Sequence, residues 1–339
     1  MYKCGIVGVS GKRARGHADA YRLIRRGKLT CVSSRQRDQL DEFGDEYRIP
    51  CRYTDYRKMF HREKPDLIHV NTPPDVRREI LEAAQDAGIP AVLIEKPIAC
   101  QGEDYSGILR FSQKSDVKVA VNHQLHFHPR RQRMQQFVSD GNIGEIRFIE
   151  ASAGMNLAYQ GTHSLQAIGA FHAEGKPVSV FGQVAGVTGL QDTPRRHYAP
   201  DQCLASIQYH NGISAVLRCG EIAPRMSTGP LHSHKRIAVY GTDGYIHWTM
   251  WSWETSTRGK REVGAHQYPE EDMIGQARMT EAMFDWLDDE TLVHPLNLEV
   301  TLRDFNIILG LYMSALNRQT VFLPVDPSPG LIDSLRKKL

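Results

Sequence analysis

A lysine that follows a short buried strand is well placed for proton chemistry. The run Val92-Leu93-Ile94-Glu95-Lys96-Pro97 begins with residues typical of a buried parallel strand and ends at an acid, a base and a proline. Ligands of open α/β sheets bind beyond the carboxyl ends of the strands, so we expect Lys96 to face a substrate. A lysine there changes its pKa readily and can exchange a proton near neutral pH. The alternative is a surface Glu–Lys pair before a turn proline.

A second group that could exchange protons stands in Tyr159-Gln160-Gly161-Thr162-His163. If this stretch begins a helix, Tyr159 and His163 lie one turn apart on one face. Histidine is the side chain whose ordinary pKa suits proton transfer near pH 7. The alternative is a hydrogen-bonded histidine at the start of a helix.

Three histidines, His123, His126 and His128, suggest a metal site. On a strand, His126 and His128 would share a face while His123 would point to the other side. No cysteine or acid stands nearby to complete a ligand set, so we expect no metal among the site residues. A zinc enzyme that uses this cluster is kept as an alternative.

The whole chain has the composition of a globular protein. It has 339 residues, 41% hydrophobic and 24% charged, with a net charge of +3, which suggests two domains and requires neither nucleic acid nor a membrane as partner. The longest apolar runs are shorter than a membrane span, and no signal peptide is recognised. The six cysteines are scattered without a CxxC spacing, so we expect reduced thiols in a cytoplasmic protein.

The elements that must position these groups change in kind near residue 122. Before it, strands alternate with helices, which predicts a doubly wound parallel sheet; after it, hairpin signals at Asn211-Gly212 and Asp243-Gly244 predict a mainly antiparallel sheet with helices. We therefore expect a dinucleotide-binding domain over 1–122 and a substrate-binding and oligomerisation α+β domain over 123–339. Expected strands are 2–9, 29–33, 67–70, 92–95, 118–121, 146–153, 178–186, 203–209, 213–219, 236–240 and 245–250. Expected helices are 14–26, 39–47, 55–61, 76–87 capped by Asp75, 102–113, 130–139, 273–287, and 298–316 capped by Asn297.

The first strand runs into the glycine turn Gly8-Val9-Ser10-Gly11-Lys12-Arg13-Ala14, which precedes a helix. Glycines let the backbone approach a pyrophosphate, and a helix N-terminus offers free N–H groups to its charge. We expect Gly8, Ser10, Gly11, Lys12 and Arg13 to contact a dinucleotide. The spacing is Gly-x-x-Gly-x-x-Ala rather than Gly-x-Gly-x-x-Gly, and an ordinary βα turn is the alternative.

The end of the second strand favours NADP over NAD. An acid at this position would bind the ribose 2′-hydroxyl of NAD, but the chain has Ser34 and Arg35, a hydroxyl and a guanidinium suited to a 2′-phosphate. The alternative is a solvated loop that carries Arg35 and Arg37.

The order of motifs resembles the Gfo/Idh/MocA family of NAD(P)-dependent oxidoreductases, many of which act on sugars and cyclitols. The resemblance rests on the glycine turn with Gly16-His17-Ala18, on Asn71-Thr72-Pro73-Pro74 and on Glu95-Lys96-Pro97, and it is strongest over residues 1–165. It implies that Lys96 is catalytic, and we expect Asn71, Thr72, Pro73, Glu95 and Lys96 to contact the cofactor.

The same resemblance implies roles in the second half. The family has Asn and Arg where this chain has Gln124 and His126, which suggests side chains that face substrate or cofactor. It has Asp-x-Gly-x-His where this chain has Tyr159 to His163, so His163 matches the catalytic acid/base. Tyr159 replaces the aspartate and cannot supply a carboxylate charge, but a tyrosine there could still position substrate or relay a proton. We therefore expect Tyr159 and His163, with Lys96, to be catalytic, and Tyr159 and His163 to contact substrate. The resemblance also implies a homodimer or homotetramer through the open face of the second sheet.

We therefore expect hydride transfer between nicotinamide and a secondary alcohol or ketone of a sugar, sugar derivative or cyclitol. His163 would exchange the hydroxyl proton and Lys96 would hydrogen-bond the same oxygen. The alternative is a non-catalytic NAD(P)- and sugar-binding sensor of the same fold, which the loss of the aspartate at Tyr159 keeps open.

Overall fold

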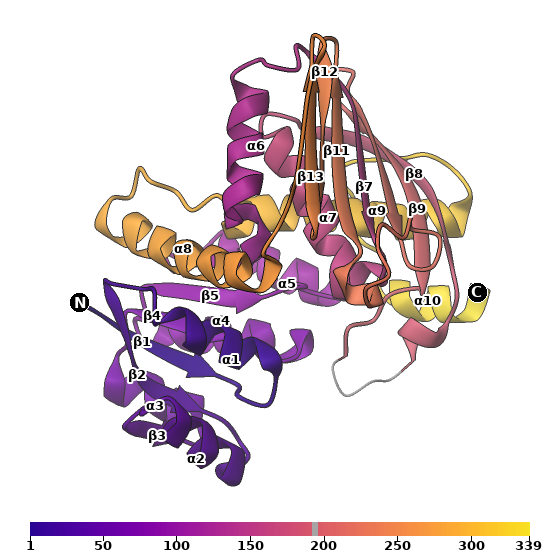
Figure 1. The fold of residues 1–339 in the computed structure, drawn as a ribbon. Coiled ribbons are helices and arrows are strands. Elements are labelled where there is room, and N and C mark those ends of the chain that lie inside the picture. The colour runs from indigo at the N-terminus through magenta and orange to yellow at the C-terminus, as the bar shows by residue number, and fades with distance from the viewer. Residues whose placement is uncertain (192–195) are drawn as a thin grey trace. The chain divides into compact units, whose positions relative to one another are not determined.

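The structure, a computed structural model, describes residues 1–191 and 196–339 (Figure 1). The chain divides into two compact units. The first comprises residues 1–98, 107–127 and 272–301, and the second comprises residues 99–106, 128–271 and 302–339. The division into a cofactor domain and a substrate domain at residue 122 stays a prediction.

A six-stranded parallel sheet forms the first unit, in the order β3-β2-β1-β4-β5-β6. This is the strand order of dinucleotide-binding doubly wound folds, in which the chain reverses direction across the sheet between β1 and β4. The strands are β1 (Tyr2–Val7), β2 (Gly27–Ser33), β3 (Cys51–Tyr53), β4 (Leu67–Val70), β5 (Ala91–Glu95) and β6 (Lys118–Asn122). The helices that follow them are α1 (Lys12–Ala20), α2 (Arg37–Glu46), α3 (Tyr56–Glu63), α4 (Arg77–Asp86) and α5 (Gly102–Ser112).

Burial explains why the central strands form here. Every residue of β4 and β5 is buried, as expected for parallel strands covered on both faces. Helix α8 (Tyr268–Asp288) supplies part of this core, since its Phe284 stacks on Tyr2 at 4.5 Å and a Cβ at Gly27 would lie 2.5 Å from the Phe284 ring. Only glycine leaves room for the aromatic ring at that position.

The second unit is built on a nine-stranded mixed sheet in the order β14-β13-β12-β11-β7-β10-β9-β8-β15. All neighbouring strands are antiparallel except β7 and β10. The strands are β7 (Ile146–Ala153), β8 (Pro177–Ala185), β9 (Gln202–Tyr209), β10 (Ser214–Cys219), β11 (Lys235–Gly241), β12 (Gly244–Thr249), β13 (Ser252–Thr257), β14 (Lys260–Ala265) and β15 (Val321–Phe322). The helices of this half are α6 (Pro129–Ser139), α7 (Thr162–Phe171), α9 (Leu298–Asn317) and α10 (Leu331–Lys338).

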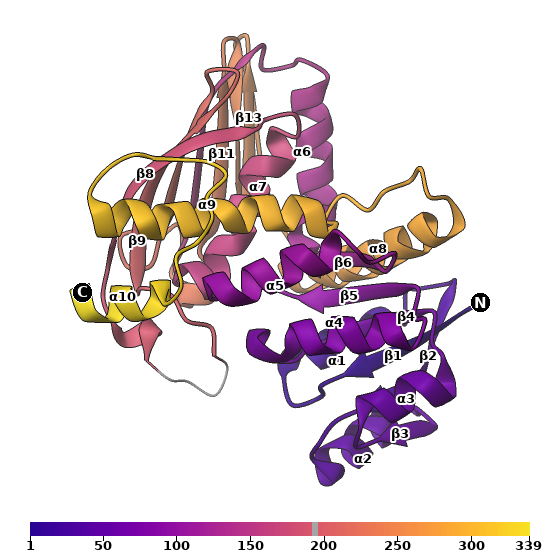
Figure 2. The same cartoon turned by 180° about the vertical axis from the view of Figure 1, so that it is seen from behind.

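Helices cover one face of this sheet. Figure 2 shows α9 across β8 and β9, where the Gly182 N–H donates to Ser314 Oγ at 3.1 Å. A Cβ at Gly182 would lie 2.5 Å from Leu311, so a glycine in the strand lets this helix approach. Residues of β9 alternate between buried and more exposed, which leaves the opposite face of the sheet uncovered.

The two-sheet architecture expected from the sequence is confirmed, with local corrections. The expected helix 14–26 begins earlier and ends at Ala20. Asp75 does not cap α4, because Pro74 starts a 3₁₀ turn (Pro74–Val76) and Val76 becomes the N-cap. In the first expected hairpin, Gly212 has the expected positive φ of 81°. In the second, Gly244 does not have a positive φ. A glycine is needed there because a Cβ would clash with the Ser256 carbonyl of β13.

Helices of the described residues are too short or too polar to cross a lipid bilayer.

Candidate functional site

The candidate cofactor-binding edge of the first unit is formed where β1, β4 and β5 end. These strands are neighbours in the sheet, so Gly8, Asn71 and Lys96 follow three adjacent carboxyl ends. Gly8 has φ of +89°, and a Cβ there would lie 3.2 Å from the Asn71 backbone. A glycine is therefore needed both for the conformation and for the close approach of the two loops.

The turn after β1 leads directly into α1. Gly11 is the N-cap of this helix and makes no side-chain cap, and a helix N-terminus offers backbone N–H groups to an anion. Ser10 and Lys12 are exposed and Arg13 is half-buried. These residues are the part of the first unit that best fits a pyrophosphate.

The loop after β4 contains polar atoms that the protein does not satisfy. Both polar atoms of the Asn71 side chain and the Thr72 hydroxyl are buried, and none has a hydrogen-bond partner among the described residues. Buried polar atoms are nearly always hydrogen-bonded in native proteins. The half-buried loop Asn71-Thr72-Pro73 therefore offers donors and an acceptor to a bound cofactor.

Arg77 connects this loop to the one that follows Lys96. Its side chain is 1% exposed, and Nε and Nη2 donate to the Thr72 carbonyl at 3.1 and 2.8 Å. Nη1 donates to the carbonyl of Pro97. One buried guanidinium thus holds two candidate site loops in a fixed arrangement.

Glu95 lies in a buried polar network at the end of β5. His17 of α1 lies with Nε2 3.2 Å from Glu95 Oε1, and the Asn122 amide donates to the same carboxylate oxygen. Gln276 of α8 contacts His17 Nδ1 at 2.9 Å and accepts from Asn122 at 3.3 Å. Three other segments of the first unit therefore contribute to the network that fixes the residue preceding Lys96.

The network implies one tautomer of His17. If the Gln276 amide N–H donates to Nδ1, then Nε2 carries the proton and donates it to Glu95. His17 Nε2 and the Asn122 amide nitrogen lie 3.1 Å apart, and in this tautomer both donate to the Glu95 carboxylate. This arrangement requires an ionised Glu95.

The environment of Glu95 favours its ionised form. Burial by itself raises the pKa of this carboxyl, but the His17 hydrogen bond and the positive charges of Arg13 and Lys96 outweigh burial and lower the pKa to about 2. Lys96, which is 8% exposed, follows directly in the chain. The carboxylate therefore provides a permanent negative charge beside the candidate catalytic lysine.

The two arginines after β2 differ in their partners. Arg37 Nε donates to Asp41 at 2.7 Å on the surface of α2. Arg35 is exposed and makes no ion pair with the described residues, and the backbone of Ser34 is held by the Tyr53 carbonyl at 3.1 Å. Of the pair, Arg35 is the guanidinium available to a phosphate.

Gln124 and His126 lie on a 3₁₀ helix (Gln124–Phe127), not on a strand, so the expected strand faces for the histidines are wrong. The turn begins because Asn122 Oδ1 accepts from the Gln124 N–H at 3.2 Å. The Gln124 side chain is buried and donates to Asp272 at 3.0 Å, whereas His126 is half-buried with its ring 5.0 Å from Phe127.

Tyr159 and His163 belong to the second unit. Tyr159 lies in a π-helical turn (Leu157–Gly161) whose N-cap, Asn156, accepts from the Tyr159 N–H at 3.0 Å. His163 is 3% exposed in the first turn of α7. Gly161 between them has no room for a side chain, since a Cβ would lie 2.6 Å from Cys219 Sγ. The Tyr159 ring contacts His197 edge-on at 4.9 Å.

Of the three histidines considered as metal ligands in the alternative reading of the sequence, only His128 belongs to a suitable group among the described residues. In the described residues, the group with suitable spacing is His128, His266 and Glu271, which excludes His123 and His126. Sequence reasoning missed His266 and Glu271 because they lie more than 130 residues after His128. Burial, the charge of His266 and those of Arg131 and Arg130 lower the pKa of His128 to about 3.

Several other structural residues of the site were also missed. Arg77, Asn122 and Gln276 carry no motif of their own, and their role depends on segments that meet only in the fold. His17 was noticed only through the family resemblance. An arginine three residues after the Pro73-Pro74 pair is a local signal that could have indicated Arg77.

Three tryptophans of the second unit differ in how far they are exposed. Trp248 is 1% exposed and belongs to the core of the second unit, Trp253 is half-buried beneath Arg130, and Trp251 is exposed.

The family that matches the first part of the chain has the Rossmann fold, in agreement with the strand order of the first unit. Residues 2–123 match the Gfo/Idh/MocA family, described as an oxidoreductase family with an NAD-binding Rossmann fold. A UDP-N-acetylglucosamine 3-dehydrogenase of Acidithiobacillus ferrooxidans is 28% identical over 149 residues, and a D-apiose dehydrogenase of Paraburkholderia graminis is 24% identical over 143 residues. The first alignment covers 44% of each chain, and the second covers 42% of this chain and 38% of the relative, so the matches span less than half of these proteins.

Solved structures match over nearly the whole chain. An oxidoreductase from Agrobacterium radiobacter, crystallised with NAD+, L-tartaric acid and magnesium, superimposes with a TM-score of 0.81 at 17% identity and covers 95% of this chain and 98% of that one. At this identity the likeness establishes the fold, including the nine-stranded second sheet.

Proposed function

We propose that this chain, whose residues 2–123 match the Gfo/Idh/MocA oxidoreductase family with an NAD-binding Rossmann fold, transfers a hydride between NAD(P) and a secondary alcohol or ketone of a sugar, sugar derivative or cyclitol. The observation that carries the proposal is the buried lysine at the end of β5, held beside an ionised Glu95. The dehydrogenases named above, which act on D-apiose and on UDP-N-acetylglucosamine, support the choice of substrate class.

The residues of the first unit fit a dinucleotide. The open N-terminus of α1 and the glycine turn would hold the pyrophosphate, and the unsatisfied atoms of Asn71 and Thr72 would contact the cofactor from the β4 side. The bound nicotinamide would supply or accept the hydride. Arg77 would keep the two loops in place during turnover.

Lys96 and His163 have different roles in the proposal. Lys96 would donate a hydrogen bond to the reacting oxygen and stabilise its negative charge, and Glu95 would keep the ammonium group in position. His163 would take the hydroxyl proton during oxidation and return it during reduction. Tyr159 would position the substrate, because a phenol cannot supply the carboxylate that the family has at its place.

NADP is the proposed cofactor, with NAD as the alternative. Arg35 is exposed and makes no ion pair with the described residues, and Ser34 precedes it at the end of β2. A guanidinium in this place would bind the 2′-phosphate through charge-assisted hydrogen bonds.

We also propose that the uncovered sheet face of the second unit forms a homodimer or homotetramer contact. Phe181 of β8 and Leu204 of β9 are exposed by 46% and 41%, and Phe322 of β15 is exposed by 77%. Phe181→Glu should shift the molar mass in light scattering to that of a monomer. A mass already equal to one chain in the wild type would contradict the proposal.

The activity is tested with a panel of sugars and cyclitols, each offered with NADP and NAD, while absorbance at 340 nm is followed. Turnover with at least one member supports an enzyme. Tight binding of the dinucleotide without turnover of any member would instead support the sensor alternative.

A further inference from the structure

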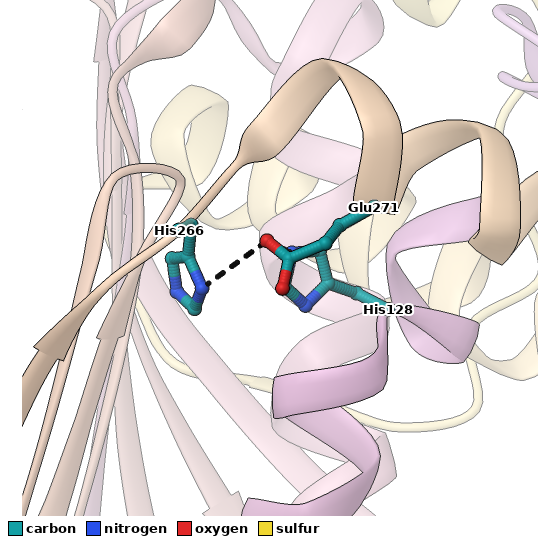
Figure 3. A group of neighbouring side chains, drawn as sticks. All are labelled: His128, His266 and Glu271. Atoms are coloured by element: carbon teal, nitrogen blue, oxygen red, sulfur yellow. Dashed lines mark ion pairs between the residues drawn. The ribbon is translucent and has the colours of Figure 1, made fainter.

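Two imidazoles and one carboxylate of the second unit surround a common point (Figure 3). One ligand atom from each of His128, His266 and Glu271 lies within 4.8 Å of the other two. His128 Nε2 and His266 Nδ1 lie 3.4 and 3.6 Å from the same oxygen, Glu271 Oε2. Ligand atoms about 2.1 Å from a tetrahedral zinc ion lie about 3.4 Å apart. Two of the three separations therefore already match such a site.

The two rings are buried without hydrogen bonds. His128 is 0% exposed and His266 is 8% exposed. None of their four ring nitrogens has a hydrogen-bond partner among the described residues. Leaving a buried polar group unsatisfied costs about 1–3 kcal/mol. An ion between the rings and the carboxylate would satisfy two of these nitrogens, His128 Nε2 and His266 Nδ1.

The backbone already fixes the three ligands. His128 is the N-cap of α6, and the His266 N–H, after β14, donates to the Trp251 carbonyl at 2.9 Å. Glu271 lies in the first turn of α8, and its Oε2 accepts from the Gln267 N–H at 3.0 Å. Because all three groups are held in place, an ion would bind without a large ordering cost.

Two positive charges oppose a cation here and limit its affinity. Arg130 and Arg131 follow His128 on α6, where they lie over the rings of Trp253 and Trp248 at 3.8 and 5.2 Å. Glu271 supplies the negative charge of the cluster. Because the arginine charges repel a cation and the Glu271 charge attracts it, removal of one arginine charge should tighten binding of a cation at this point.

We propose that His128, His266 and Glu271 bind one divalent transition-metal ion, with zinc as the ion that this donor set suits and with one open coordination position. The ion would tie the start of α6 to the segment between β14 and α8. Bound there, the ion joins three elements of the second unit, and the inference does not depend on the proposed oxidoreductase activity.

The test uses full-length protein without a histidine tag, stripped with a chelator and then titrated with zinc in a calorimeter. We expect one zinc ion per chain and a higher Tm in the presence of zinc. Glu271→Gln keeps an oxygen for the Gln267 N–H but loses the charge, and His266→Gln loses a ligand. Each should weaken zinc binding at least about tenfold, the lower end of the cost of losing even an outer-shell partner.

Two further variants separate the site from adventitious binding and from misfolding. His61→Gln removes an exposed histidine of α3 and should leave zinc affinity unchanged. Arg130→Gln should tighten zinc binding several-fold, which a damaged fold cannot do. No stoichiometric binding by the wild type, equal affinity in wild type and Glu271→Gln, or a similar loss in His61→Gln would each overturn the proposal.

Discussion

Glu95 is the residue whose environment says most about the candidate site. It is a buried carboxylate held in its ionised form by a histidine, an amide and two nearby positive charges, and it precedes the lysine proposed to contact substrate. A charge fixed in this way cannot be lost during turnover at neutral pH. We infer that Glu95 is a positioning residue for Lys96.

The lowered pKa of Glu95 predicts a pH dependence of stability. Its contribution is complete above the unfolded value of 4.5 and is lost as pH falls toward about 2, because the unfolded state binds the proton first. The difference in unfolding free energy between wild type and Glu95→Gln should be constant from pH 7 to about 5. Below that it should shrink by up to about 1.4 kcal/mol per pH unit.

Urea unfolding of both proteins across this pH range measures the difference. Glu221→Gln, a change at an exposed glutamate, serves as the control and should show no such slope. A difference between wild type and Glu95→Gln that is independent of pH would contradict the assignment.

Arg35 offers a test of cofactor choice at the same scale. Loss of a charged hydrogen bond to a phosphate costs about 1.5–3 kcal/mol, so Arg35→Ala should weaken NADPH binding by about 10- to 100-fold and leave NADH binding nearly unchanged. Fluorescence titration with each nucleotide gives the two constants. Arg37→Ala is the matched control, because Arg37 already pairs with Asp41. Equal effects on NADPH and NADH would rule out the phosphate role.

At the scale of elements, Arg77 is the connection between the loops that follow β4 and β5. Arg77→Met would leave the Thr72 and Pro97 carbonyls without this partner and should destabilise the protein by about 2–4 kcal/mol. It should also weaken dinucleotide binding, because both loops lose their fixed position. Chemical unfolding and nucleotide titration measure the two effects. Arg78→Met, on the exposed side of α4, should change neither, and similar stability of the two variants would refute the role of Arg77.

The elements themselves were predictable to different degrees. The strands β4 and β7 have the same bounds in the sequence expectation and in the structure, since apolar residues between turn residues carry a clear pattern. The β13–β14 hairpin was missed because β14 is an exposed edge strand, with charged residues where an apolar alternation would be expected. The His17–Glu95–Asn122–Gln276 network could not be predicted, because hydrogen bonds between distant segments leave no periodic signal.

At the scale of the whole molecule, the sequence allowed the two sheets to be predicted and the resemblance of residues 2–123 to the family to be recognised. The glycine turn and the Glu95-Lys96-Pro97 motif were enough to predict the first sheet, because both follow local rules for the ends of parallel strands. The proposed metal ligands required the fold, since His266 and Glu271 reach His128 only after the second sheet has formed. Site chemistry built from several distant segments is the part that the sequence alone left out.

The most direct test of the central claim is the rate of NADP reduction at 340 nm with an active member of the sugar and cyclitol panel, in wild type, Lys96→Met and His163→Asn. Each variant should keep a native circular dichroism spectrum and lose turnover by about 10²- to 10⁴-fold. Full turnover by both variants would contradict the proposed roles of Lys96 and His163.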